Sequence, residues 1–152
     1  MQFVIKRDIL LKSLNFVQGV VEKKNTLPIL SNVLIELKGK KLSIVATDLD
    51  IVFKDEIDDV KSITEGSTTT SAAILFDILR KISSNSEINF DLKSENKLSL
   101  KSDNADFNLL CLPTDNFPTF SDDFESNEIP IDNKRFLKLL GLLTFPYKLD
   151  YL

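Results

Sequence analysis

The side chains best suited to chemistry are one pair of carboxylates, one thiol and a scattered set of cations. Asp48 and Asp50 stand two residues apart at the end of an expected strand, where paired carboxylates can hold Mg²⁺. The chain has no histidine, no glycine-rich phosphate loop and no third acidic residue at a spacing typical of a metal site. We therefore interpret Asp48 as an acceptor for backbone amides, and we predict no catalytic residue, no metal and no cofactor.

The thiol belongs to Cys111, the single cysteine of the sequence. It follows Leu109 and Leu110 in an expected strand, and a reactive cysteine would need a base beside it. We predict a buried, unreactive thiol.

The cations are outnumbered, because 19 Lys and Arg face 23 Asp and Glu and the formal net charge is −4. This balance argues against a nucleic-acid binder with a broad basic footprint. The basic residues nevertheless gather on the outer faces of expected helices. A weakly positive helix face could contact phosphates without reading bases, whereas the simpler alternative is a solvated face. The residues are Lys12, Lys23 and Lys24, then Arg80 and Lys81, then Lys134, Arg135 and Lys138.

The first of these helices is expected between a strand around Phe3 and Ile5 and a proline-containing loop. Asp8 is the predicted N-cap, and the helix is expected to run to about Lys23. Its apolar residues recur at helical spacing and should face a sheet. They are Leu10, Leu14, Val17 and Val21.

The loop at residues 26–30 leads into a strand hairpin that ends at Asp50. Pro28 restricts the backbone, so we expect Leu27 and the following apolar residues to turn inward. Alternating apolar residues predict two strands on either side of a turn at residues 38–40.

The second half of the chain contains a similar series. Ser71 is the predicted cap of a helix whose apolar stripe should hold Ile74, Leu75, Ile78, Leu79 and Ile82. Lys97-Leu98-Ser99-Leu100 repeats Lys41-Leu42-Ser43-Ile44, each directly after a short turn. We interpret this as an internal duplication of β-α-β-β-β units. The predicted fold is α+β, with two helices side by side on an antiparallel sheet.

A third copy is expected to begin at Ile129, where Asp132 caps a further helix. An acidic stretch with prolines and phenylalanines precedes it, as is typical of a linker. We predict a first domain at 1–121, a linker at 122–128 and the start of a second domain at 129–152. The match to the repeat stops after about Leu140.

With 43% hydrophobic residues and no apolar run near the roughly 20 residues that span a bilayer, we expect a soluble, cytoplasmic protein. The N-terminus enters a strand directly, without the pattern of a signal peptide.

Three motifs, taken in order, resemble the first domain of the bacterial β sliding clamp, the beta subunit of DNA polymerase III. They are Thr26-Leu27-Pro28-Ile29-Leu30, Thr47-Asp48-Leu49-Asp50 and Leu112-Pro113-x-x-x-Phe117-Pro118, and the resemblance covers about residues 1 to 140. It implies a DNA-clamp fold and a non-enzymatic processivity factor. In full length, such a protein would form a homodimeric ring that slides on double-stranded DNA and binds the polymerase and the clamp loader.

The resemblance also implies particular sites. Lys24 matches a basic DNA-contacting position, Arg80 is a second candidate and Lys12 shares the outer helix face. The subunit interface would use an edge strand with Phe107 and Leu109, together with Ile78 and Ile74 of the second helix. Ala73, Asn104 and Asp106 stand where basic residues are common in the family.

We expect a truncated clamp that neither closes a ring alone nor binds clamp-binding peptides. Two alternatives remain, namely an interaction module that pairs through a sheet edge without a DNA role, and a clamp remnant without function.

Overall fold

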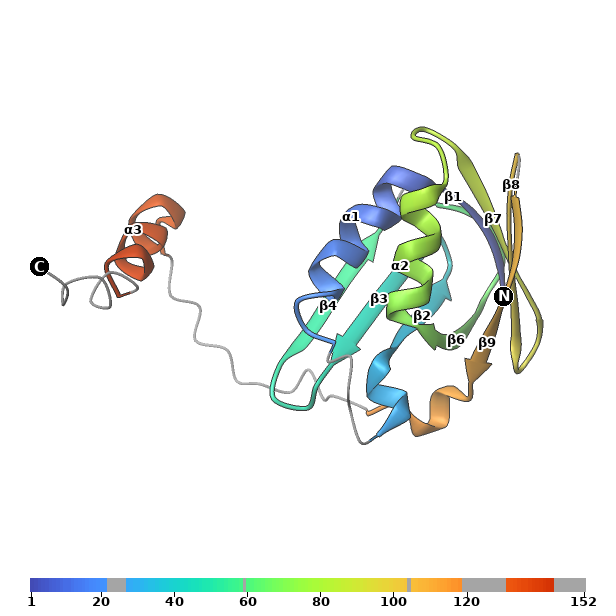
Figure 1. Ribbon diagram of the computed structural model, residues 1–152, viewed down its shortest axis with the longest axis horizontal. Coiled ribbons are helices and arrows are strands. Elements are labelled where there is room, and N and C mark those ends of the chain that lie inside the picture. Colours follow the sequence, from blue (N-terminus) through green and yellow to red (C-terminus); the bar gives the residue numbers. More distant parts are fainter. Residues whose placement is uncertain (22–26, 59, 104, 119–130, 144–152) are drawn as a thin grey trace, which may run out of the picture. The chain divides into compact units, whose positions relative to one another are not determined.

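The computed structural model describes residues 1–21, 27–58, 60–103, 105–118 and 131–143 (Figure 1). The chain divides into two compact units, Met1–Thr119 and Phe120–Leu152, which are described separately. In the first unit, the secondary structure runs β1 Gln2–Lys6, α1 Arg7–Val17, the 3-10 helix η1 Pro28–Ser31, β2 Asn32–Lys38, β3 Lys41–Thr47, β4 Val52–Ile57, β5 Lys61–Thr64, β6 Gly66–Ser71, α2 Ala72–Lys81, β7 Glu87–Ser94, β8 Lys97–Ser102, β9 Ala105–Leu112 and the 3-10 helix η2 Thr114–Asn116.

The strands of this unit pair in the order β4-β3-β2-β6-β9-β8-β7-β1-β5, and the pairings are antiparallel. The two halves of the chain exchange their first strands. β1 pairs with β7 of the second half, and β6 pairs with β2 of the first half. This reciprocal exchange confirms the duplicated β-α-β-β-β units and the α+β fold.

The repeated tetrapeptides occupy equivalent places in the two halves, at the starts of β3 and β8. In both strands the two apolar residues are fully buried and alternate with serine, which is half-buried at Ser43 but only 3% exposed at Ser99. Phe3 of β1 and Phe90 of β7 are direct partners in the sheet, and their rings stack with centroids 4.7 Å apart. The exchange of strands therefore also packs side chains of the two halves against each other in the core.

Helix α1 buries Leu10, Leu14 and Val17 and exposes Lys12 and Asn15, as its periodicity predicts. Its predicted limits were wrong at both ends. Lys6 is the N-cap and places Asp8 inside the first turn, and the helix ends at Val17, not near Lys23. Lys6 makes no side-chain capping bond, because its ammonium group can donate hydrogen bonds but cannot accept one from a helix amide.

Ser71 caps α2 as predicted, its hydroxyl accepting a hydrogen bond from the Ile74 amide at 3.4 Å. Leu75 and Leu79 are fully buried and Ile82 nearly so. Ile74 was wrongly placed in the buried stripe, since its side chain is 53% exposed. Ala72 takes the inward position one turn earlier on the buried face.

Two further expectations on the first unit were wrong. Leu27 does not turn inward but is 51% exposed, and Leu30 alone fills the core from that loop. Strand β5 was not predicted, because its four residues contain a single apolar side chain, Ile63, which is itself exposed.

The second unit contributes one described helix, α3 Asn133–Leu143. Asp132 caps it as predicted, with Oδ1 accepting a hydrogen bond from the Arg135 amide at 2.8 Å. Residues 119–130, which include the predicted linker, lie outside the described residues. None of the helices in the described ranges has the length and apolarity that crossing a membrane would need.

Candidate nucleic-acid interface

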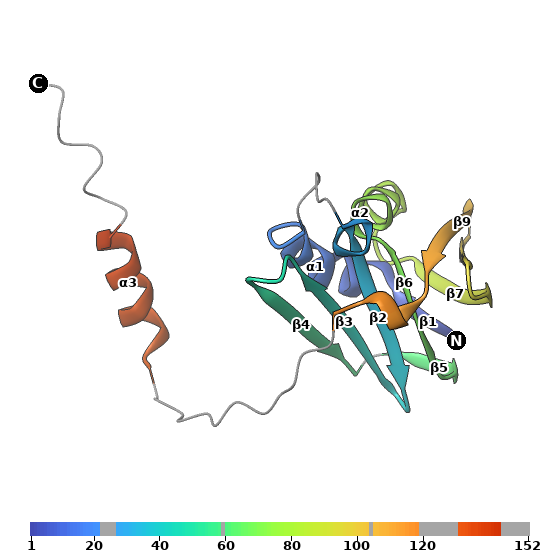
Figure 2. The same ribbon diagram turned by 90° about the horizontal axis from the view of Figure 1, so that it is seen from below.

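Helices α1 and α2 lie side by side on one side of the strands (Figures 1 and 2). Their ends are joined by side chains that reach from one helix to the other. Arg7 at the start of α1 donates from Nε to the carbonyl of Leu79 at 2.7 Å, near the end of α2. Gln18, just after α1, donates to the carbonyl of Ala72 at 3.4 Å, at the start of α2. The two helices are therefore antiparallel and held at both ends.

Arg7 is the centre of the contact at one end. Its second terminal nitrogen reaches the Arg80 carbonyl at 3.3 Å, and Nη1 pairs with Asp8 at 2.7 Å. The other oxygen of Asp8 accepts from the Asn85 amide at 2.8 Å. The hydrogen bond from Arg7, followed by that from the amide of Asn85, holds the pKa of Asp8 below its ordinary value. Sequence reasoning missed Arg7, although a cation at the first residue of a helix was a visible signal.

Some of the basic residues predicted for this face are exposed on the helices, and others lie outside the described residues. Lys12, Arg80 and Lys81 are exposed on the helix pair. The guanidinium of Arg80 stands 5.6 Å from the centroid of the Phe76 ring on the same helix, which directs it along the surface. Lys24 lies outside the described residues, as does Lys23. In the second unit, Lys134, Arg135 and Lys138 are exposed on α3.

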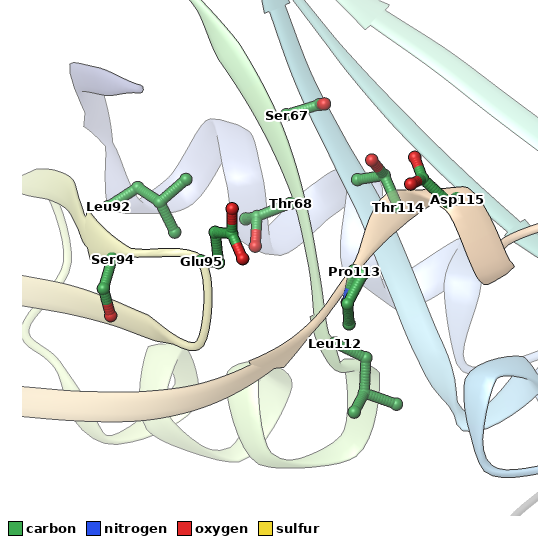
Figure 3. Close-up of a pocket in the computed structure, with 9 residues that line it drawn as sticks. All are labelled: Ser67, Thr68, Leu92, Ser94, Glu95, Leu112, Pro113, Thr114 and Asp115. Atoms are coloured by element: carbon green, nitrogen blue, oxygen red, sulfur yellow. The ribbon is translucent and has the colours of Figure 1, made fainter.

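The opposite side of the sheet has a different character. A hollow of about 430 Å³ lies between β6, the β7–β8 turn and η2 (Figure 3). Ser94 and Glu95 line one wall, and Thr114 and Asp115 line the wall across from them. Two carboxylates at its rim would repel phosphate. The helix face is therefore the better candidate for a nucleic-acid contact.

The residues predicted for a subunit interface lie in three places. Ile74 and Leu109 line one groove of about 400 Å³ beside the start of α2. Phe107 lines a different, smaller hollow, and Ile78 is half-buried against the core. Strand β9 is not a simple edge strand, since it pairs with both β8 and β6. The β6 pairing covers only Cys111 and Leu112, and the Leu110 carbonyl accepts a hydrogen bond from Thr70 Oγ1 at 3.1 Å. Among the described residues, that edge of β9 is therefore open from Ala105 to Leu109.

The Asp48 carboxylate binds backbone amides, as predicted. Asp48 Oδ1 accepts hydrogen bonds from the amides of Asp50 at 3.0 Å and Ile51 at 2.7 Å. These bonds support a tight β3–β4 turn in which Leu49 adopts a φ of 85°. Within the described ranges, no three His, Cys, Asp or Glu side chains are grouped so that they could hold a metal ion. Cys111 is 5% exposed, and burial raises the pKa of its thiol.

Comparison with known proteins gives consistent matches. The family described as "DNA polymerase III beta subunit, N-terminal domain" matches residues 1–121. The beta sliding clamp of Caulobacter vibrioides is 36% identical over 150 residues, and that of Pseudomonas putida is 33% identical over 145. Each alignment covers 95% of this chain but 39% of the relative.

Solved structures of beta subunits also align with this chain. The Caulobacter crescentus pol III beta structure aligns with a TM-score of 0.87 at 36% identity, covering 93% of this chain and 38% of that one. The DNA polymerase III subunit beta of Pseudomonas aeruginosa aligns with a TM-score of 0.87 at 34% identity, with the same shares covered. The chain therefore spans about two fifths of the length of these relatives.

Proposed function

The chain belongs to the DNA polymerase III beta-subunit family, and from this premise we propose that it supplies the N-terminal domain of a sliding clamp. In this proposal, residues 1–121 form that domain, 122–128 the linker and 129–152 the start of a second domain. The complete ring would encircle duplex DNA and act as a non-catalytic processivity factor in the cytoplasm. It would hold the replicative polymerase and be opened by a clamp loader.

The observation that carries this proposal is the arrangement of the helix pair. α1 and α2 share one side of the strands and expose Lys12, Arg80 and Lys81, whereas the protein as a whole is acidic. An acidic body with a weakly basic helix face would approach phosphates with that face alone.

The mechanism follows from the weakness of each contact. Exposed lysine and arginine side chains bind phosphate oxygens without reading base edges, so binding does not depend on sequence. Individually weak contacts can exchange from one phosphate to the next while a closed ring prevents escape. Lys12 and Arg80 are the proposed phosphate contacts in the described part of this domain, together with Lys24.

The subunit interface in this proposal uses the open edge of β9 and the neighbouring groove. Leu109 and Ile74 line that groove together, and Phe107 lies two residues along the same strand. A strand added at the open edge would satisfy its backbone groups. Ile78 would support the interface from the side of α2.

The test is a chimera in which residues 1–121 of this chain replace the matching segment of the Caulobacter vibrioides relative. The chimera is loaded on nicked circular plasmid and passed through a sizing column, before and after the plasmid is linearised. We expect retention on the circle and loss after linearisation. Equal loss from both forms would reject a ring, and equal retention would indicate ordinary surface binding.

A matched pair of variants tests the helix face in the same chimera. Lys12→Glu combined with Arg80→Glu should shorten retention on the circle and make it more sensitive to salt, because two phosphate contacts are lost. Lys97→Glu is the control, since Lys97 is an exposed cation of β8 whose neighbours Leu98 and Ser99 are buried. An equal effect of the control would contradict the assignment of this face.

A further inference from the structure

The hollow between β6, the β7–β8 turn and η2 holds negative charge that no described side chain neutralises (Figure 3). The carboxylates of Glu95 on one wall and Asp115 on the wall across from it make no hydrogen bond or ion pair with another described residue. The residues that line the hollow include no described lysine or arginine. Carboxylates placed around one space without a counter-charge attract a cation.

A buried hydroxyl borders the same space. Thr68 is 2% exposed, and its Oγ1 has no hydrogen-bond partner among the described residues. Figure 3 shows this side chain turned from β6 toward the wall that holds Glu95. The Cys111 thiol lies beside the hydroxyl, but sulfur is a weak hydrogen-bonding atom. A buried hydroxyl without a partner costs free energy, which a ligand that donates a hydrogen bond to it would recover.

The walls of the hollow are held in place by hydrogen bonds of the fold. The Cys111 amide donates to the Asn96 carbonyl at 3.0 Å, which fixes the β7–β8 turn beside the end of β9. The Thr69 hydroxyl donates to the Leu112 carbonyl at 2.8 Å, which ties the last residue of β9 to β6. A ligand would therefore enter a site that is already formed, and binding would cost little ordering of the protein.

The size and the apolar part of the lining define the kind of cation. The hollow measures about 430 Å³, which is in the range of sites for small organic molecules. A bare metal ion would need several oxygen ligands at about 2.0–2.6 Å. Leu92, Leu112 and Pro113 also line the hollow. An alkyl chain would leave water to pack on these side chains, while charged ends would remain at the carboxylates.

We propose that the hollow binds a protonated aliphatic diamine or polyamine. One ammonium group pairs with Glu95 and donates to Thr68 Oγ1, and a second pairs with Asp115. The hydrocarbon chain between them packs on Leu92 and Leu112. A single ammonium group, such as that of a lysine side chain from another protein, would leave one carboxylate unpaired. This inference does not rest on the proposed DNA role, because it uses only the residues of the hollow.

The experiment is a titration of the full 152-residue chain at low ionic strength, followed through the chemical shifts of the backbone amides. The probes are putrescine and spermidine, with butylamine as a matched amine that has a single ammonium group, and Mg²⁺ as a metal alone. We expect saturable shifts confined to the residues of the hollow. Putrescine or spermidine should bind roughly tenfold more tightly than butylamine, because a second charge-assisted contact is made.

Variants of the two walls and of the hydroxyl test each contact. Glu95→Gln and Asp115→Asn, each alone, should reduce the affinity for the diamines to about that of butylamine. Asp77→Asn is the matched control, since Asp77 is an exposed carboxylate on α2, and should leave the affinity unchanged. Thr68→Val should weaken binding severalfold without lowering the melting temperature, because the hydroxyl that it removes has no partner within the described part of the chain.

Thermal unfolding of every variant checks that folding is intact. Equal affinity for butylamine and the diamines would overturn the proposal and indicate a site for a single ammonium group. Shifts spread over acidic residues outside the hollow, or an equal effect of Asp77→Asn, would overturn it in favour of attraction to the acidic protein as a whole. Tighter binding of Mg²⁺ at the same residues would replace it with a metal site.

Discussion

Replacing Arg7 with methionine tests whether the antiparallel helix pair depends on a single side chain. Arg7 is 13% exposed and donates to the Leu79 carbonyl at 2.7 Å and to the Arg80 carbonyl at 3.3 Å. A hydrogen bond from a charged group stabilises a fold by about 1.5–3 kcal/mol. The second bond is long and exposed and adds less. Exposed ion pairs also contribute little, so the pair with Asp8 hardly changes the sum. We expect Arg7→Met to lower the free energy of unfolding by about 2–3 kcal/mol.

The assay is urea unfolding of the full chain followed by far-ultraviolet circular dichroism. A lower midpoint with an unchanged slope would report lost stability and not a changed denatured state. Arg80→Met is the matched control, because it removes an exposed guanidinium that lies over the half-buried Phe76 ring, a loss of about 0.5–1 kcal/mol. A loss of stability in Arg7→Met no larger than that in Arg80→Met would show that the helix pair does not depend on the Arg7 side chain.

Four further outcomes follow from the structure. The pKa of Asp8 is lowered in the folded state, so its contribution is complete above the ordinary pKa of aspartate and is lost as pH falls through the folded pKa; the stability difference between wild type and Asp8→Asn should therefore shrink on acidification in a pH series of urea melts. Phe90→Ala empties a fully buried ring position and should cost about 3–5 kcal/mol in the same assay, far more than Phe16→Ala, whose ring is 59% exposed. Gly39 has a φ of 59° with open space around its missing side chain, so Gly39→Ala should cost about 1–2 kcal/mol from backbone strain alone. The raised thiol pKa and burial of Cys111 predict negligible labelling by a thiol-reactive disulfide in the native chain and rapid labelling in urea; rapid native labelling would contradict the burial.

The sequence predicted helix caps correctly where the capping contact joins residues that are close along the chain. Ser71 and Asp132 cap helices because a short polar side chain directly before an apolar periodic run can accept the free amides of the first turn. The same rule failed at Asp8, where the strand runs straight into the helix and the carboxylate is used instead to hold Arg7 and a distant loop amide. That use depends on tertiary contacts that a one-dimensional pattern does not contain.

The pairing of the strands in the sheet could not be predicted from the sequence. Duplication was visible in the repeated tetrapeptides, but the exchange of β1 and β6 between the halves was not, since strand pairing across distant segments leaves no local signal. Ile74 fits an apolar stripe by spacing, yet it lies exposed beside the groove that it shares with Leu109. For the same reason, the partly open edge of β9 required the structure.

The claim that the helix pair faces the duplex is tested most directly by asking which face of this domain touches DNA. In the chimera described above, a photo-crosslinking residue is placed either at Asn15, exposed on α1, or at Lys97, exposed on β8. The chimera is loaded on circular plasmid and irradiated. We expect DNA crosslinks from position 15 and none above background from position 97. Crosslinks from position 97 alone, or equally from both, would contradict the claim that the helix pair faces the duplex.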